Sequence, residues 1–151
     1  MPAPFVHHLR PRYAEIDLQG VVFNAHWLTY FDEASTRFFA EIRETPAQTV
    51  FSDFDVMVVK ATLEWEGPAR FDDDVAIEVV PSRIGNASFD LTYSATVGGR
   101  GACVGVITYV SVMPGTHDST PIPERIRASL DERHVPVGAD ASGASRGDAV
   151  G

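Results

Sequence analysis

The alternation of apolar and polar residues that begins after Phe54 constrains this chain more than any other feature. Apolar side chains recur at every second position in four consecutive segments, which start near Met57, Val75, Phe89 and Ala102. A period of two places successive side chains on opposite faces of a β-strand. Turn-forming glycines follow the first three segments, at 67–68, 85–86 and 98–101. Consecutive strands joined by tight turns predict an antiparallel sheet.

A single long helix precedes these strands. Between Trp27 and Arg43 the apolar residues recur at steps of three and four, and charged residues occupy the other side. The apolar positions are Leu28, Phe31, Ala34, Phe38 and Ile42. We therefore predict an amphipathic helix of roughly 17 residues. Pro46 is expected to close it.

The remaining elements are short. Residues 5–10 predict an edge strand, and Pro123 at the first position of a helix predicts a short C-terminal helix that ends near Arg133. Together the elements predict an α+β fold, in which one long helix lies across a five-stranded antiparallel sheet. Residues 1–135 are predicted to form one domain, and 136–151, which lack aromatic residues, a disordered tail. Such a sheet leaves its other face and its edges uncovered, so we expect a homo-oligomer.

Composition narrows the class of function. The 151 residues include 12 Lys and Arg against 21 Asp and Glu, and the net charge is −9. Nucleic acids and anionic membranes bind clustered cations, so we expect neither as a partner. The single cysteine, Cys103, can form no internal disulfide, which favours a reducing, cytoplasmic location. His7 and His8 are adjacent in a predicted strand and would face opposite sides, so we expect no metal site there.

The segment whose residues are best suited to catalysis directly precedes the long helix. Residues 12–27 have the sequence RYAEIDLQGVVFNAHW. Asp17 and Gly20 frame a predicted turn, and Asn24 is suited to cap the helix, whose first amides would be unpaired donors. A carboxylate close to such donors suits acyl transfer, because the amides polarise a carbonyl while the carboxylate attacks it or activates water. By itself, an Asp-x-x-Gly turn before a helix is more often structural.

Four motifs together resemble a known family. They are RYAEIDLQGVVFNAHW at 12–27, YFDEAS at 30–35, PARFDD at 68–73 and RIGNASF at 83–89. In this order they resemble motifs of the hotdog-fold acyl-CoA thioesterases, specifically the 4-hydroxybenzoyl-CoA thioesterase-like group. The resemblance implies the hotdog fold, in which the five-stranded sheet wraps around the long helix, and it implies hydrolysis of a thioester.

The resemblance also implies a set of site residues. Asp17 would be catalytic, as nucleophile or as general base, and the backbone N–H of Asn24 would polarise the thioester carbonyl. Some relatives carry His where Asn24 stands, and an amide cannot transfer protons as His does. The residues assigned to substrate binding are Gly20, Val21, His26, Tyr30, Glu33, Arg70, Arg83 and Ser88. Arg70 and Arg83 suit the phosphates of coenzyme A, and Ser88 lies where this family often passes the pantetheine arm. An interface role stays open for His26, Tyr30 and Glu33, and an ordinary surface role for Arg70 and Arg83.

We therefore predict an acyl-CoA thioesterase that releases a free carboxylic acid and coenzyme A. It would need no metal or redox cofactor and would act as a dimer or a homotetramer. One alternative is release of acyl or polyketide chains from an acyl carrier protein, although a chain of net charge −9 offers an acidic carrier no basic docking patch. Another is a non-catalytic acyl-CoA-binding module, which would not need Asp17. The aromatic residues Trp27, Phe31, Phe38 and Phe39 suit either an aromatic acyl pocket or the core.

Overall fold

The sheet and helices are those expected from the sequence pattern. A computed structural model describes residues 2–136. The strands are β1 (Phe5–Leu9), β2 (Asp55–Trp65), β3 (Val75–Ile84), β4 (Ser88–Val97) and β5 (Arg100–Val112). The helices are α1 (His26–Arg43) and α2 (Glu124–Arg133), with short 3₁₀ turns η1 (Tyr13–Glu15) and η2 (Ala47–Thr49). The tail predicted from residue 136 onward lies outside the described residues, except for Pro136.

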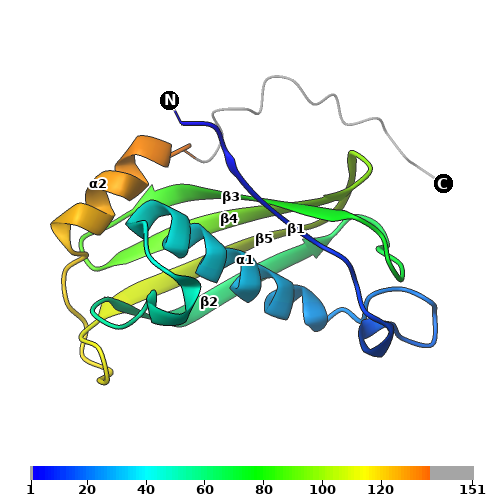
Figure 1. The fold of residues 1–151 in the computed structure, drawn as a ribbon, viewed down its shortest axis with the longest axis horizontal. Coiled ribbons are helices and arrows are strands. Elements are labelled where there is room, and N and C mark those ends of the chain that lie inside the picture. The colour runs from blue at the N-terminus through cyan, green and yellow to red at the C-terminus, as the bar shows by residue number, and fades with distance from the viewer. Residues whose placement is uncertain (1, 137–151) are drawn as a thin grey trace.

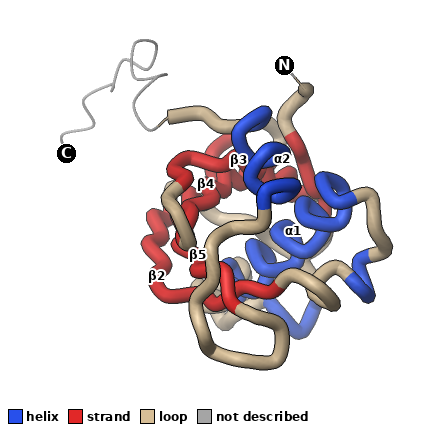
Figure 2. Tube along the Cα trace, turned by 90° about the vertical axis from the view of Figure 1, so that its left-hand side faces the viewer, coloured by secondary structure: helices blue, strands red, loops and turns tan. Residues whose placement is uncertain are grey.

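The five strands form one antiparallel sheet in the order β1-β3-β4-β5-β2. Figure 1 shows α1 lying across one face of this sheet, and the turned view in Figure 2 shows strands β2 to β5 on one side and both helices on the other. The predicted turns between β3 and β4 and between β4 and β5 are confirmed. The expectation that β2 joins β3 in the same way is wrong. β1 and β4 flank β3 on its two sides, so β2 pairs with β5 at the far edge.

The buried face of α1 differs slightly from the predicted one. Its buried residues are Trp27, Tyr30, Phe31, Ala34, Ser35, Phe38 and Phe39. Leu28 was assigned to this face and is instead 42% exposed, because the stripe that meets the sheet runs through Trp27 and Phe31. All four aromatic residues considered for an acyl pocket are therefore core residues, each at most 2% exposed.

Phe31 sets how closely α1 approaches the sheet. Its ring stacks on Tyr93 of β4 with the centroids 4.9 Å apart. On β5, a Cβ atom added to Gly105 would lie 2.6 Å from Cε2 of Phe31. Only a residue without a side chain leaves room for the ring at this distance.

The helix ends also differ in detail from the prediction. α1 ends at Arg43, and the next residue, Glu44, adopts a left-handed conformation with φ of 50°, so the helix has already ended when the chain reaches Pro46. Pro123 is the N-cap of α2 and not its first helical residue. Among residues 2–136, no helix is both long enough and apolar enough to cross a membrane.

β2 is the most exposed strand. It is an 11-residue edge strand, and its exposed apolar residues are Met57, Val58, Val59 and Trp65. Within the described chain only β5 pairs with it. An edge of this length with unpaired backbone groups is a template for pairing with another chain.

Candidate active site

Asp17 lies in a loop between η1 and α1 that is closed like a hairpin. The Asp17 N–H donates to the carbonyl of Val21 at 2.9 Å, and the Gly20 N–H donates to the carbonyl of Asp17 at 3.0 Å. Gly20 has φ of +77°, a conformation that favours glycine. The Val22 N–H donates to the carbonyl of Ala69 at 2.8 Å, which fixes the loop to the segment before β3. The predicted turn framed by Asp17 and Gly20 is therefore confirmed.

The Asp17 carboxylate faces an open cleft. The cleft has a volume of about 720 Å³ and is lined by Tyr13, Ile16, Asp17, Leu18 and Phe71. Oδ1 of Asp17 accepts the Gln19 N–H at 2.8 Å. No group within residues 2–136 donates a hydrogen bond to the second carboxylate oxygen. A half-buried carboxylate with one free oxygen beside apolar side chains can attack an ester carbon or take a proton from water.

The start of α1 corrects the prediction that Asn24 caps the helix. The helix begins at His26, the N-cap position is Ala25, and no side chain accepts a capping hydrogen bond. Ala25 already has helical dihedral angles, φ of −69° and ψ of −23°, whereas a side-chain cap needs an extended residue at this position. The turn is made instead by the His26 N–H, which donates to the carbonyl of Phe23 at 2.9 Å. The backbone N–H of Asn24 donates to no acceptor within the described residues, so it is free to bind a substrate oxygen.

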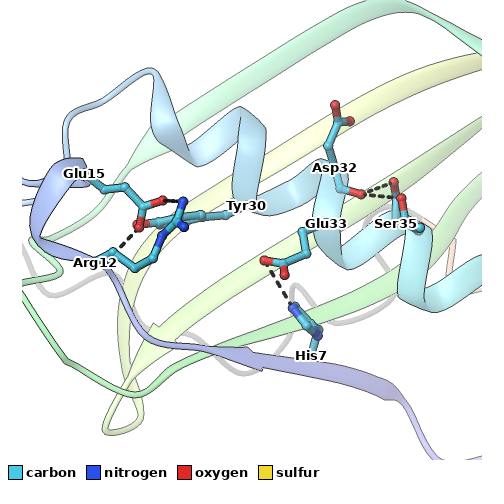
Figure 3. Close-up of polar contacts among 8 residues, drawn as sticks. His7, Arg12, Glu15, Tyr30, Asp32, Glu33 and Ser35 are labelled. Carbon is cyan, nitrogen blue, oxygen red and sulfur yellow. Dashed lines mark hydrogen bonds and ion pairs between the residues drawn. The ribbon is translucent and has the colours of Figure 1, made fainter. Parts of the chain in front are cut away.

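Glu15 is the last residue of η1, directly before this loop, and the sequence did not reveal its role. Its side chain is 10% exposed. One carboxylate oxygen accepts the backbone N–H of Arg12 at 2.8 Å and the hydroxyl of Tyr30 at 2.9 Å, and the other accepts the Arg12 guanidinium at 3.1 Å (Figure 3). Its carbonyl accepts the Phe23 N–H at 3.0 Å. Glu15 therefore joins both arms of the Asp17 loop to α1.

The same contacts set the ionisation of this pair. Burial favours the neutral form of Glu15, but the hydrogen bonds from Arg12 and Tyr30 outweigh it, so the pKa of Glu15 lies below its ordinary value of 4.5. Burial and the hydrogen bond to Glu15 raise the pKa of Tyr30 above its ordinary value. At neutral pH a Tyr30 hydroxyl thus donates to a Glu15 carboxylate.

Removing the Tyr30 hydroxyl tests how much its hydrogen bond to Glu15 stabilises the fold. We expect Tyr30→Phe to lower the free energy of unfolding by about 2 kcal/mol, the usual contribution of a hydrogen bond to a charged group. Because the pKa of Glu15 is lowered in the folded state, its ionised form stabilises the protein above about pH 4.5, and this stabilisation is lost as the pH falls through the folded-state pKa. The difference between variant and wild type should therefore shrink toward acidic pH. Urea unfolding at several pH values measures it, and a difference that does not vary with pH would contradict the assignment.

Several other predicted residues lie at the same end of the molecule as Asp17. Gly20 and Val21 belong to the loop itself, and Arg70 directly precedes Phe71 of the cleft. His26 packs edge-to-face against Phe23, which lies just before α1. Tyr30 and Glu33 line a different cleft, of about 400 Å³, together with Leu9, Arg10, Arg12, Glu15 and Thr29. The predicted residues thus surround the loop but divide between two clefts.

Arg83 and Ser88 lie at the opposite end of the sheet. The Asp17 loop is fixed near the start of β3, and by its position in that strand Arg83 lies about 26 Å from Val75. The Arg83 guanidinium donates to both carboxylate oxygens of Asp90 and to the hydroxyl of Ser88, each at 3.1 Å. Within one subunit these two residues do not share a site with Asp17. Their predicted roles in binding coenzyme A stay predictions.

The two adjacent histidines face opposite sides of β1, as predicted. His7 lies 3.6 Å from Glu33 (Figure 3), whereas His8 lies 3.1 Å from Asp74. In the part of the chain that the structure describes, no three His, Cys, Asp or Glu side chains are grouped to hold a metal ion.

Comparisons with known proteins agree with this fold. The family model of the Thioesterase superfamily matches residues 19–104, more than half of the chain, and begins just after Asp17. A protein of Aquifex aeolicus (strain VF5), whose name marks it as a candidate esterase, is 23% identical over 90 residues, which are 60% of this chain and 70% of that protein.

Solved structures extend the similarity over most of the described residues. A gentisyl-coenzyme A thioesterase superposes with a TM-score of 0.76 at 25% identity, covering 83% of this chain and 99% of that chain. A thioesterase from Thermus thermophilus, complexed with coenzyme A and Zn, gives a TM-score of 0.72 at 25% identity, covering 84% and 91%. A 1,4-dihydroxy-2-naphthoyl-CoA thioesterase from Synechocystis gives 0.74 at 17% identity, covering 86% and 97%, which shows the fold alone. The resemblance found in the sequence is confirmed, and the chain belongs to the thioesterase superfamily as a hotdog-fold thioester hydrolase.

Proposed function

We propose that this protein hydrolyses an acyl-CoA to a free carboxylic acid and coenzyme A, and that Asp17 is its catalytic carboxylate. The observation that carries the proposal is the half-buried Asp17 carboxylate, which has one free oxygen and faces a cleft of about 720 Å³. Two structures that are 25% identical to this chain support the choice of thioester, since one is a gentisyl-coenzyme A thioesterase and the other is bound to coenzyme A.

The loop offers both groups that the reaction needs. The free N–H of Asn24 donates to the thioester oxygen and stabilises the negative charge that develops there. Asp17 then either attacks the carbonyl carbon, which releases the thiol and leaves a mixed anhydride for water to cleave, or takes a proton from the water that attacks directly. Because a thioester is already activated, positioning and these two groups suffice, and we expect no metal or redox cofactor.

The cleft favours an apolar acyl group. Tyr13, Leu18 and Phe71 are at least 58% exposed and contribute apolar surface beside the carboxylate. Tyr13 and Phe71 meet edge-to-face with their centroids 6.4 Å apart. Burying exposed aromatic surface of this kind is most favourable when the ligand that covers it is also apolar or aromatic. We therefore propose an aromatic or long-chain acyl group over acetyl.

Thiol release from a panel of acyl-CoA esters tests this function. We expect turnover on aromatic or long-chain acyl-CoA, with kcat/KM above that on acetyl-CoA by at least about tenfold, which corresponds to burial of roughly two methylene groups. The same acyl group presented on an acyl carrier protein should react more slowly. If the folded protein releases thiol only from the carrier-bound ester, the carrier-protein alternative replaces this proposal. Binding of acyl-CoA without any thiol release would identify a non-catalytic module.

We further propose a homo-oligomer, either a dimer or a tetramer, in the reducing cytoplasm. The exposed edge of β2 and the exposed apolar residues beside Asp17 support association with a second copy. Cys103 is fully buried, and burial raises the pKa of its thiol to about 12, so it stays an unreactive thiol.

A further inference from the structure

The two ends of the Asp17 loop are held together like the base of a hairpin. An antiparallel bridge joins Ile16 to Val22. Next to this bridge, the Phe23 N–H donates to the carbonyl of Glu15 at 3.0 Å. Asn24, whose free N–H is the proposed donor to the thioester oxygen, follows Phe23 directly. The place of this N–H relative to the carboxylate of the loop therefore depends on the base of the loop staying closed.

The Glu15 side chain ties this base to α1. Its two carboxylate oxygens accept three hydrogen bonds, two from Arg12 and one from the hydroxyl of Tyr30. Tyr30 is 3% exposed and packs edge-to-face against Trp27 with the centroids 5.5 Å apart, so its hydroxyl has a fixed place. It stands four residues after His26, which puts it one helical turn from the helix start. Through this contact the loop is fixed to the first turns of α1.

The Glu15 carboxylate lies apart from the proposed reaction. It lines the cleft of about 400 Å³ with Arg12 and Tyr30, whereas Asp17 lines the other cleft. Figure 3 shows the Glu15, Arg12 and Tyr30 side chains gathered between η1 and α1. A carboxylate in this place contacts no substrate bound beside Asp17, so any effect of Glu15 on the reaction must pass through the backbone of the loop.

We propose that Glu15 is a positioning residue for thioester hydrolysis, and that its hydrogen bonds hold the Asp17 carboxylate and the Asn24 N–H in the arrangement the reaction requires. This inference rests on the proposed function. A misplacement of reacting groups by about 1 Å can lower a rate by roughly 100-fold. An interaction that matters mainly in the transition state changes kcat more than KM. Loss of the Glu15 carboxylate should therefore lower kcat and leave KM nearly unchanged.

Steady-state thiol release from an acyl-CoA, at a temperature where every variant is folded, tests this split. We expect Glu15→Ala to lower kcat at least about tenfold and to change KM less than about twofold. Glu15→Gln should keep kcat within about threefold, because its amide oxygen can still accept the Arg12 N–H and the Tyr30 hydroxyl. If Glu15→Ala does not fold, Tyr30→Phe takes its place, with an expected loss in kcat of at least about threefold.

Leu130→Ala is the control for a loss of stability alone. Leu130 is fully buried in α2, which lies at the opposite end of the molecule from the Asp17 loop (Figure 1). Its truncation destabilises the fold without touching the loop, so kcat should stay within about twofold of wild type. An equal loss of kcat in Leu130→Ala and Glu15→Ala would overturn the proposal. A Glu15→Gln variant as slow as Glu15→Ala would also overturn it, since the hydrogen bonds would then not suffice.

Amide hydrogen exchange, measured residue by residue by NMR, supplies a readout that needs no activity. In Glu15→Ala the Asp17 and Phe23 amides, which donate across the loop, should exchange at least about tenfold faster relative to the amides of β4. Leu130→Ala should leave this ratio unchanged. An unchanged ratio in Glu15→Ala overturns the inference whatever the kinetics. If the wild type releases no thiol from any acyl-CoA, the proposed function fails, and exchange alone decides whether Glu15 orders the loop.

Discussion

Asp17→Asn is expected to lower kcat/KM for thiol release by at least about 100-fold, equivalent to roughly 2.7 kcal/mol of transition-state stabilisation. Asparagine has the shape of aspartate but is a poor nucleophile and cannot accept the proton of water. The loop should survive the change, because an amide oxygen can still accept the Gln19 N–H. Steady-state thiol release by the two proteins, matched by circular dichroism and melting temperature, measures the effect.

Asn24→Ala is the control for this experiment. The proposed donor at this position is the backbone N–H, which alanine keeps, and the Asn24 side chain does not cap α1. Turnover should therefore stay within about threefold of wild type. A loss comparable to that of Asp17→Asn would place the Asn24 side chain in the chemistry. Full activity of Asp17→Asn would instead show that hydrolysis does not run through this carboxylate, while the family and the fold would stand.

The sequence predicted the elements of this fold better than their pairing. Alternation over β3, β4 and β5, joined by glycine turns, fixes both the strands and the two hairpins, because these contacts are local. The same alternation shows that β2 is a strand but does not indicate which other strand it pairs with. Its pairing with β5 joins segments far apart in the chain, such as Trp65 with Cys103. Such a pairing is decided by the whole sheet and not by the turn that follows β2.

The candidate site shows the same division. The Asp17 turn was predictable because Asp and Gly act within four residues of each other. The Glu15–Tyr30 hydrogen bond joins residues 15 positions apart on different elements, and the only sequence signal for it was Glu15 itself, an acidic residue inside the recognised motif. Asn24 was wrongly assigned as the cap because residue preference does not show at which residue the backbone first adopts helical dihedral angles. In this structure Ala25 already has helical dihedral angles.

Phe31→Ala is expected to be the most destabilising of the substitutions considered. The Phe31 side chain is fully buried and stacks on Tyr93, so its removal leaves a cavity between α1 and the sheet. Such changes lower the free energy of unfolding by about 3–5 kcal/mol, which is a large part of the total for a domain of this size. Urea unfolding measures the loss. Leu28→Ala is the control on the same helix, and since this side chain is 42% exposed, it should cost less than about 1 kcal/mol.

Gly105→Ala shows whether the close contact itself positions α1. The new Cβ would lie 2.6 Å from Cε2 of Phe31, so the ring or the helix must move, and we expect a loss of about 1–3 kcal/mol. In a Phe31→Leu background the shorter side chain leaves room for this methyl group. The double variant should therefore lose clearly less stability than the sum of the two single changes. Strict additivity would show that Gly105 is required for some other reason. A coupled result would mean that one glycine on β5 sets the height of α1 above the sheet, and with it the position of the helix start that follows Asn24.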